Sequence, residues 1–178
     1  MNGTALPTLG TARLRLRPFS VADAPDVQRL AGAREIAATT LTVPHPYEDG
    51  LAEQWIATHG PAFTEGKSLT LAVTELASGA LVGAVGLALT PRDHRAELGY
   101  WIGVPYWGRG YATEAARAIV EHGIRALGLH RIMARHMAHN LASGRVMQKI
   151  GMTREGVLRE HVFKWGRYED LVVYALLT

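Results

Sequence analysis

Two hydrophobic patterns alternate along the chain and predict a mixed order of strands and helices. Polar and apolar residues that alternate one by one predict strands, whereas apolar residues spaced by three and four predict helices. On this basis, strands are expected at 13–17, 68–75, 80–89, 95–104, 131–137, 153–163 and 168–177. Helices are expected at 21–30, 48–59, 112–127 and 141–150, and the segment 33–47 is expected to be irregular. The order favours an α/β sandwich built on a mixed sheet.

The strand at 95–104 leads through a short glycine-bearing turn into the most regular of the expected helices. Pro105 ends the strand, and Gly108 and Gly110 flank Arg109 just before the helix. The first backbone N–H groups of a helix have no internal partner, and together with the helix dipole they attract anions. Small residues here allow a phosphate to approach the backbone, and Arg109 adds positive charge. The alternative interpretation is an ordinary strand-to-helix turn, in which glycine is needed only because it can adopt the backbone angles of the turn.

The composition narrows the class of protein. A chain of 178 residues with 48% hydrophobic and 20% charged residues fits one soluble globular domain spanning 1–178. The absence of cysteine excludes disulfides, zinc sites built on thiolates and a cysteine nucleophile. No apolar run is long enough to cross a bilayer, and the first residues do not resemble a signal peptide. A cytoplasmic location away from membranes is therefore expected.

Charge is distributed unevenly along the chain, although the formal net charge is only +3. Residues 109–178 hold eleven Lys and Arg against six Asp and Glu, whereas residues 1–108 hold eight against ten. The C-terminal part therefore favours a polyanionic ligand and the N-terminal part a cationic one, unless the clustering is only chance on a solvated surface. The basic residues do not form the concentrated stripe that nucleic-acid binding usually needs, so no nucleic-acid partner is expected.

Four separate segments resemble one family of enzymes. Trp107-Gly108-Arg109-Gly110-Tyr111-Ala112 resembles motif A of the GNAT acetyltransferases, Gln/Arg-x-x-Gly-x-Gly/Ala, with Trp107 in place of Gln or Arg. The segments that resemble the RimJ/RimL branch of this family are Thr11–Pro18, Asn140-x-x-Ser143 with Lys149-x-Gly151-Met152, and Gly166–Asp170. The resemblance thus covers nearly the whole chain, and the combination is far more specific than any one motif.

The resemblance implies a single GNAT domain with an α/β sandwich fold. Its central sheet is expected to be mixed and mostly antiparallel, with about seven strands, a splay between the fourth and fifth, and about four flanking helices. The implied activity moves an acetyl group from acetyl-CoA, the co-substrate, to a primary amine by direct transfer in a ternary complex, without a metal. The implied acceptor is a protein N-terminal amine of the ribosomal-protein type, or a small amine such as a polyamine, an amino acid or an aminoglycoside. A CoA-binding module without catalytic activity is a further alternative.

The residues that the resemblance assigns to acetyl-CoA lie in the matched motifs. The backbone around residues 108–113 is expected to hold the pyrophosphate, and the strand end at 102–104 to pair with the pantetheine arm. Asn140 is expected to bond the pantetheine amide, although the role of a simple helix N-cap fits it at least as well. The full set of expected cofactor-binding residues is Ile102, Gly103, Val104, Gly108, Arg109, Gly110, Tyr111, Ala112, Thr113, Asn140, Ser143 and Lys149.

Three residues are candidates for the chemistry. Many family members protonate the leaving thiolate with a tyrosine, but the matching position here is Met147, so Ser143 is expected to take this role as in RimL-like enzymes. The alternative for Ser143 is a solvent-facing residue of an amphipathic helix. Glu97, on the strand beside the splay, is the preferred base, and Glu160 in the C-terminal hairpin is the second candidate. A backbone N–H near residues 102–104 is expected to stabilise the oxyanion.

The acceptor is expected to enter opposite the CoA, near the proline-containing loop at 40–47. Tyr168 and Asp170 are candidates for the acceptor pocket, although Asp170 is equally suited to accept backbone hydrogen bonds in a structural role. His136 and His139 have a suggestive spacing, but they straddle a strand end and no carboxylates cluster with them in the sequence, so no metal is expected. Exposed sheet edges allow either a monomer or a homodimer.

Overall fold

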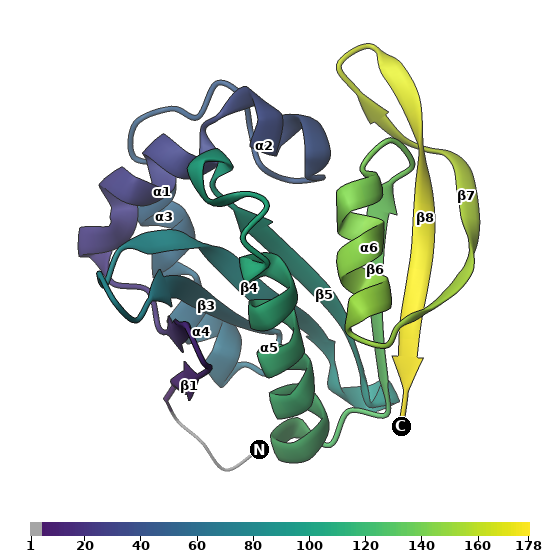
Figure 1. Ribbon diagram of the computed structural model, residues 1–178, viewed down its shortest axis with the longest axis horizontal. Helices are drawn as coiled ribbons and strands as arrows, with labels where there is room; N and C mark the ends of the chain where they lie inside the picture. Colours follow the sequence, from purple (N-terminus) through teal and green to yellow (C-terminus); the bar gives the residue numbers. More distant parts are fainter. Residues whose placement is uncertain (1–4) are drawn as a thin grey trace.

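The core of the protein is a single mixed sheet, seen in a computed structural model that describes residues 5–178 (Figure 1). The eight strands follow the order β1-β2-β3-β4-β5-β6-β8-β7, and every neighbouring pair is antiparallel except β5 and β6. Their bounds are β1 Leu9–Gly10, β2 Leu14–Arg17, β3 Ser68–Glu75, β4 Leu81–Thr90, β5 Arg95–Ile102, β6 Arg131–Met137, β7 Thr153–Lys164 and β8 Arg167–Leu177.

Helices cover both faces of this sheet. Within residues 5–178 the six α-helices are α1 Ala24–Ala31, α2 Arg34–Thr39, α3 Leu51–Ala57, α4 His59–Thr64, α5 Tyr111–Leu127 and α6 Leu141–Lys149. Helices α5 and α6 lie side by side on one face, with α5 across the middle strands and α6 in front of β6 (Figure 1). Helices α1 to α3 pack on the opposite face. None of the helices in the described part of the chain is long and apolar enough to cross a membrane.

Two hydrophobic clusters hold the layers together, because the middle strands are buried on both faces. Leu71 and Leu98 belong to the cluster beneath α5, whereas Ala72 and Trp101 belong to the cluster beneath α1. Gly123 allows α5 to lie close to the sheet, since a Cβ at this position would stand only 2.9 Å from Leu87 Cδ1. Close packing along its length fixes where the N-terminus of α5 points.

The strands β5 and β6 separate partway along their length. Their parallel register runs from Arg95 opposite Arg131 to Leu98 opposite Ala134 and ends there. Beyond these pairs, β5 continues to Ile102 and β6 to Met137, so a gap opens between them toward their C-terminal ends. We call this opening the β5–β6 gap. It is the splay that the sequence predicts between the fourth and fifth expected strands.

The expected mixed, mostly antiparallel sandwich is confirmed, but several details of the prediction are wrong. The sheet has eight strands rather than about seven, because the two-residue β1 pairs with β2, and a segment so short has no readable alternation. Residues 34–39 form α2 instead of irregular chain, with Ile36 and Ala37 buried. The expected helix at 48–59 is instead the pair α3 and α4, so six helices replace about four. The strand expected at 95–104 ends at Ile102, and a 3₁₀ turn follows at Val104–Tyr106.

Candidate active site

The turn before α5 forms a nest of backbone N–H groups. Gly108 (φ 77°) and Gly110 (φ 81°) both adopt left-handed conformations that favour glycine. Glu114 N donates to Gly110 O at 3.1 Å as the first turn of the helix closes. The backbone N–H groups of residues 111–113 lie before the first hydrogen bond inside the helix, so they have no partner within it, as the first N–H groups of a helix generally do. Whether they bind an anion stays a prediction.

The side chains of this turn point away from the nest. The Tyr111 hydroxyl donates to Glu75 Oε1 at 2.7 Å. The Arg109 guanidinium donates to Pro105 O at 3.1 Å and stands 3.7 Å from Glu75 Oε1. Hydrogen bonds from Tyr111 and Ser78 hold the pKa of Glu75 below its usual range, so this carboxylate offsets part of the Arg109 charge. The nest therefore presents backbone rather than the extra charge expected from Arg109.

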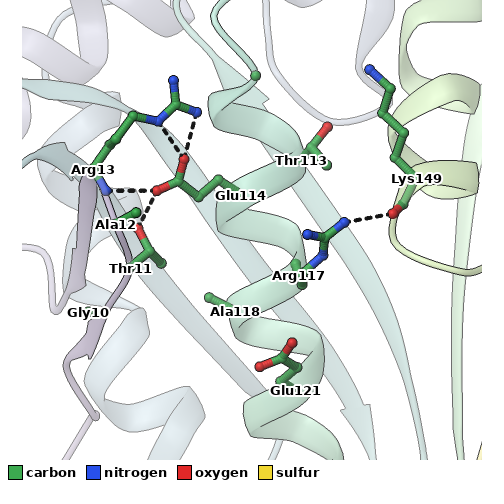
Figure 2. Close-up of a pocket in the computed structure, with 11 residues that line it drawn as sticks. Gly10, Thr11, Ala12, Arg13, Thr113, Glu114, Arg117, Ala118, Glu121 and Lys149 are labelled. Carbon is green, nitrogen blue, oxygen red and sulfur yellow. Dashed lines mark hydrogen bonds and ion pairs between the residues drawn. The ribbon is translucent and has the colours of Figure 1, made fainter.

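A depression of about 560 Å³ crosses the outer face of α5 beside the nest (Figure 2). One wall comes from residues 10–13, and the other comes from Lys149 at the end of α6. Arg117 Nη2 donates to Lys149 O at 2.8 Å and thereby ties the two helices together. In Figure 2 the Thr113 hydroxyl and the Lys149 ammonium both extend toward the N-terminal end of α5. Three of the residues expected to bind the cofactor, Gly110, Thr113 and Lys149, thus line one surface.

The edge of β5 beside the gap offers fewer backbone groups than the sequence suggests. Successive strand residues direct their N–H and C=O groups alternately to the two sides. Gly103 N donates to Val82 O at 2.8 Å, so the Gly103 N–H is committed to β4. The same alternation turns the backbones of Tyr100 and Ile102 toward the gap. Because Ile102 O accepts from Trp107 Nε1 at 2.5 Å, the Ile102 N–H and the Tyr100 backbone are left to pair with a ligand.

Helix α6 brings Ser143 to the other wall of the gap. Asn140 is the N-cap of this helix, and its Oδ1 accepts from Ser143 N at 3.2 Å, as its alternative interpretation requires. The Ser143 Oγ lies 2.8 Å from the hydroxyl of Tyr100, which projects from β5. Burial raises the pKa of Tyr100 to about 12. Tyr100 was missed by sequence reasoning; its one sequence signal is that it follows Leu98 by two residues and so shares the α6-facing side of β5.

Glu97 is held by an arginine on the neighbouring strand. Its two carboxylate oxygens accept from Arg135 Nε and Nη2, both at 2.9 Å. Strand alternation places Glu97 on the sheet face of Trp101, opposite the face of Tyr100. Glu97 and Ser143 therefore approach the gap from opposite faces of the sheet.

The second candidate base, Glu160, lies in a bulge of β7. Leu158 pairs with Leu171 and Val162 pairs with Glu169, so three residues of β7 face Asp170 alone. Glu160 has a φ of 48° and its N–H donates to Asp170 Oδ1 at 2.7 Å, while its side chain is exposed. Asp170 thus stabilises the bulge through the backbone, which is the structural alternative for this residue.

The tip of the β7–β8 hairpin reaches across to the segment 34–47. Lys164 Nζ donates to Thr40 O at 2.7 Å, and the guanidinium of Arg34 lies 5.1 Å from the ring centre of Trp165. Tyr168 lies at the same tip but is 64% exposed. Together α2, residues 40–47 and the hairpin tip border the face of the gap on which Glu97 lies, where the acceptor was expected to enter.

The two histidines considered as metal ligands have separate environments. His136 is buried against Gly144, and its Nδ1 lies 2.8 Å from Met137 O. His139 is partly exposed, with Nδ1 at 3.3 Å from Glu169 Oε2 and Nε2 at 3.3 Å from Ala38 O. Among residues 5–178 there is no group of three or more His, Asp and Glu side chains placed to hold a metal ion.

Similarity to known proteins identifies the family of this chain. The model of the acetyltransferase (GNAT) domain matches residues 13–153, and the chain therefore belongs to the GNAT acetyltransferase family. Among its relatives, the N-acetyltransferase YoaA of Bacillus subtilis is 34% identical over 123 residues, which cover 68% of this chain and 70% of that protein.

Further similar proteins include a ribosomal-protein N-acetyltransferase and the solved structure of RimJ. The ribosomal protein uS5 alanine N-acetyltransferase of Escherichia coli is 36% identical over 85 residues, or 48% of this chain and 44% of that protein. The structure of Mycobacterium smegmatis RimJ in complex with CoA-disulfide superposes with a TM-score of 0.87 and 23% identity, covering 99% of this chain and 90% of that chain. That likeness shows the shared fold.

Proposed function

We propose that this chain transfers the acetyl group of acetyl-CoA to a primary amine by direct transfer in a ternary complex. The observation that carries the proposal is the gap that opens beyond Leu98 and Ala134, with the nest of α5 at its end. A nest that binds an anion and a free strand edge that pairs with amides fit two adjoining parts of one CoA molecule, the pyrophosphate and the pantetheine arm. The structure of M. smegmatis RimJ, which has the same fold, is a complex with CoA-disulfide.

The donors of this chain fit acetyl-CoA without a metal. The N–H groups at residues 111–113 suit the pyrophosphate, and the backbone of Tyr100 suits the amides of the pantetheine arm. Lys149, beside Thr113, suits a phosphate at the surface. When bound, acetyl-CoA supplies an acetyl group activated as a thioester.

The two candidate catalytic side chains take separate tasks in this proposal. Ser143 donates a proton to the leaving sulfur from the α6 side of the gap. Glu97 removes a proton from the acceptor ammonium on the opposite face. Because both Glu97 oxygens accept from Arg135, its carboxylate is held in one orientation, and a water molecule is proposed to carry the proton to it. The Ile102 N–H is the simplest donor to the developing oxyanion.

We propose a protein N-terminal amine as the acceptor, by analogy with the E. coli relative that acts on a ribosomal protein alanine. Small amines such as spermidine, free amino acids and aminoglycosides are the competing class. A thiol-release screen separates them: peptides beginning with different residues are compared with these small amines at equal concentration. Higher kcat/KM for one peptide series supports the proposed acceptor, whereas faster turnover of a small amine contradicts it.

A binding measurement tests the basis of the proposal independently of any acceptor. Isothermal titration of the whole chain with CoA should give a defined one-to-one binding curve. Binding that weakens steeply with salt would support phosphate recognition by the nest and the nearby basic residues. No detectable heat with either CoA or acetyl-CoA, confirmed by unchanged thermal unfolding at high ligand concentration, would contradict the acetyl-transfer function. Binding without thiol release from any acceptor would favour a CoA-binding module instead.

A further inference from the structure

Tyr100 occupies a position in the gap that the proposed chemistry leaves unexplained. It lies two residues beyond the last β5–β6 pair, on the side of β5 that faces α6. Its hydroxyl lies 2.8 Å from Ser143 Oγ and 3.2 Å from Ser143 O. The contact joins residues 43 positions apart, so it exists only because α6 packs over the gap.

The direction of this hydrogen bond decides what Ser143 can do. Each hydroxyl has one proton, so if Ser143 donates to Tyr100, no serine proton is left for a group in the gap. If Tyr100 donates to Ser143 Oγ, the serine proton is free to point into the gap. Ser143 lies inside α6, where the helical pattern already gives its carbonyl oxygen an N–H partner four residues later. Donation to Oγ, the shorter contact, is therefore open to Tyr100.

Serine alone is a poor proton donor. A thiol has a pKa of about 8.5 and a phenol a pKa of about 10, whereas an alkyl hydroxyl is a far weaker acid than either. Proton transfer from an isolated serine to a thiolate would therefore leave a high-energy alkoxide. A phenol that gives its own proton to the serine oxygen at the same time removes that alkoxide. The negative charge then rests on the Tyr100 oxygen. Because burial raises the pKa of Tyr100 to about 12, this phenolate costs more than a phenolate in water, but it still costs less than a serine alkoxide.

We propose that Tyr100 is a positioning residue for Ser143. Tyr100 turns the Ser143 O–H toward the sulfur end of the gap, and it replaces the proton that Ser143 gives up. As the carbon–sulfur bond breaks, its electron pair goes to sulfur, the Ser143 proton moves to sulfur, and the Tyr100 proton moves to Ser143 Oγ. The phenolate then regains a proton from solvent. This inference rests on the proposed acetyl transfer, because it assigns the leaving sulfur to this end of the gap.

The first test measures the thiol of bound CoA and needs no acceptor. The pH titration of the thiolate is followed by ultraviolet absorbance with CoA bound to the wild type, Tyr100→Phe, Ser143→Ala and the double variant. A donor aimed at sulfur stabilises the thiolate, so the pKa of the bound thiol should be lower in the wild type than in each variant by about one pH unit. Equal titrations in all four proteins would overturn the proposal.

The matched control is Tyr174→Phe. Tyr174 packs in the same hydrophobic cluster as Tyr100. Its hydroxyl accepts from Gln148 Nε2 at 3.3 Å and makes no hydrogen bond to Ser143. This variant should titrate bound CoA as the wild type does. If thermal unfolding shows that Tyr100→Phe is less stable, comparison with Tyr174→Phe at a temperature where both are folded separates structural loss from the loss of the serine contact.

The second test uses turnover with an amine acceptor from the thiol-release screen. Tyr100→Phe and Ser143→Ala should each lower kcat by about 30-fold with little change in KM for acetyl-CoA, and the double variant should be no slower than Ser143→Ala. Losses that multiply would show that Tyr100 acts independently of Ser143 and would overturn the proposal. Failure of the wild type to bind CoA contradicts the proposed function itself, whereas normal CoA binding with full activity of Tyr100→Phe contradicts only the role of Tyr100.

Discussion

The two sides of the β5–β6 gap are built in different ways. On the donor side, which comprises the start of α5 and α6, the defining contacts are local: Gly110 O meets Glu114 N, and Asn140 Oδ1 meets Ser143 N. On the acceptor side, formed by α2, residues 40–47 and the β7–β8 hairpin tip, Lys164 reaches a residue 124 positions away. Under the proposed function, a short stretch of sequence would specify donor binding, whereas acceptor choice would depend on how distant segments meet.

The largest expected effect concerns stability of the helical layer behind the acceptor side. His59 is buried between Phe19 and Trp55 with neither ring nitrogen hydrogen-bonded in the described part of the chain, and burial lowers its pKa to about 4. The unfolded chain takes up a proton near pH 6.5 that the folded protein resists. Stability is therefore fully present above pH 6.5 and falls as the pH drops toward 4, by about 3 kcal/mol.

Denaturant titrations at pH 7.5 and pH 4 measure this loss. The variant His59→Phe should show a smaller fall between the two pH values than the wild type, because it removes the group that titrates. The control is His161→Phe, an exposed histidine in the β7 bulge, which should follow the wild type. An identical pH dependence for His59→Phe and wild type would show that the histidine is not held neutral.

The next effect separates the two sides in turnover. Glu97→Gln should lower kcat about 100-fold, equivalent to about 2.7 kcal/mol, because the neutral amide cannot take up a proton. Affinity for CoA should stay unchanged in isothermal titration, since Glu97 lies on the face opposite Ser143. Glu155→Gln is the control: Glu155 also pairs with an arginine of β6, Arg131, but at the opposite end of the strand. Full activity of Glu97→Gln would remove Glu97 as the base.

A third effect isolates the nest. Gly110→Ala should weaken CoA binding about tenfold, equivalent to about 1.4 kcal/mol, because alanine resists the left-handed conformation that shapes the turn. Gly128→Ala introduces the same conflict at the other end of α5, where φ is 65° and a Cβ meets nothing within 4 Å. Both variants should lose similar stability, but only the first should lose affinity. Equal CoA affinities would show that the nest does not hold the ligand.

The smallest effect tests the acceptor side alone. Lys164→Met removes the bond from Nζ to Thr40 O between the hairpin tip and the loop. We expect KM for the amine acceptor to rise about threefold, equivalent to about 0.7 kcal/mol, with the CoA affinity unchanged. Lys67→Met, which removes only a surface pair with Glu65, is the control. A change in CoA affinity for Lys164→Met would mean that the two sides are coupled.

The sequence predicted well those features that neighbouring residues determine. The expected strand positions and the helix between Gly110 and Gly128 are confirmed. The alternation of polar and apolar residues, and the glycines that bound an element, can both be recognised within a few residues of sequence. The N-cap at Asn140 depends on a partner only three residues away. The nest follows from the same local rules.

The missed features depend on partners that the sequence does not place nearby. Helix α2 is too short for its period to be visible, and it is held by the burial of Ile36 and Ala37. The contact of Tyr100 with Ser143 requires α6 to be seated on the gap. Likewise, the pairing of Glu97 with Arg135 appears only once β5 and β6 lie side by side. The roles of the expected site residues in catalysis and binding stay predictions.

The unpaired stretch of β5 has a consequence beyond ligand binding. Free strand edges invite association with other chains, and proteins generally cover or distort them. Here the open edge lies inside the sheet, between two strands that diverge from Leu98 and Ala134 onward. A strand from another chain could reach this edge only by entering between β5 and β6. The divergence of β5 and β6 therefore leaves backbone groups of β5 unpaired without placing them at the outer edge of the sheet.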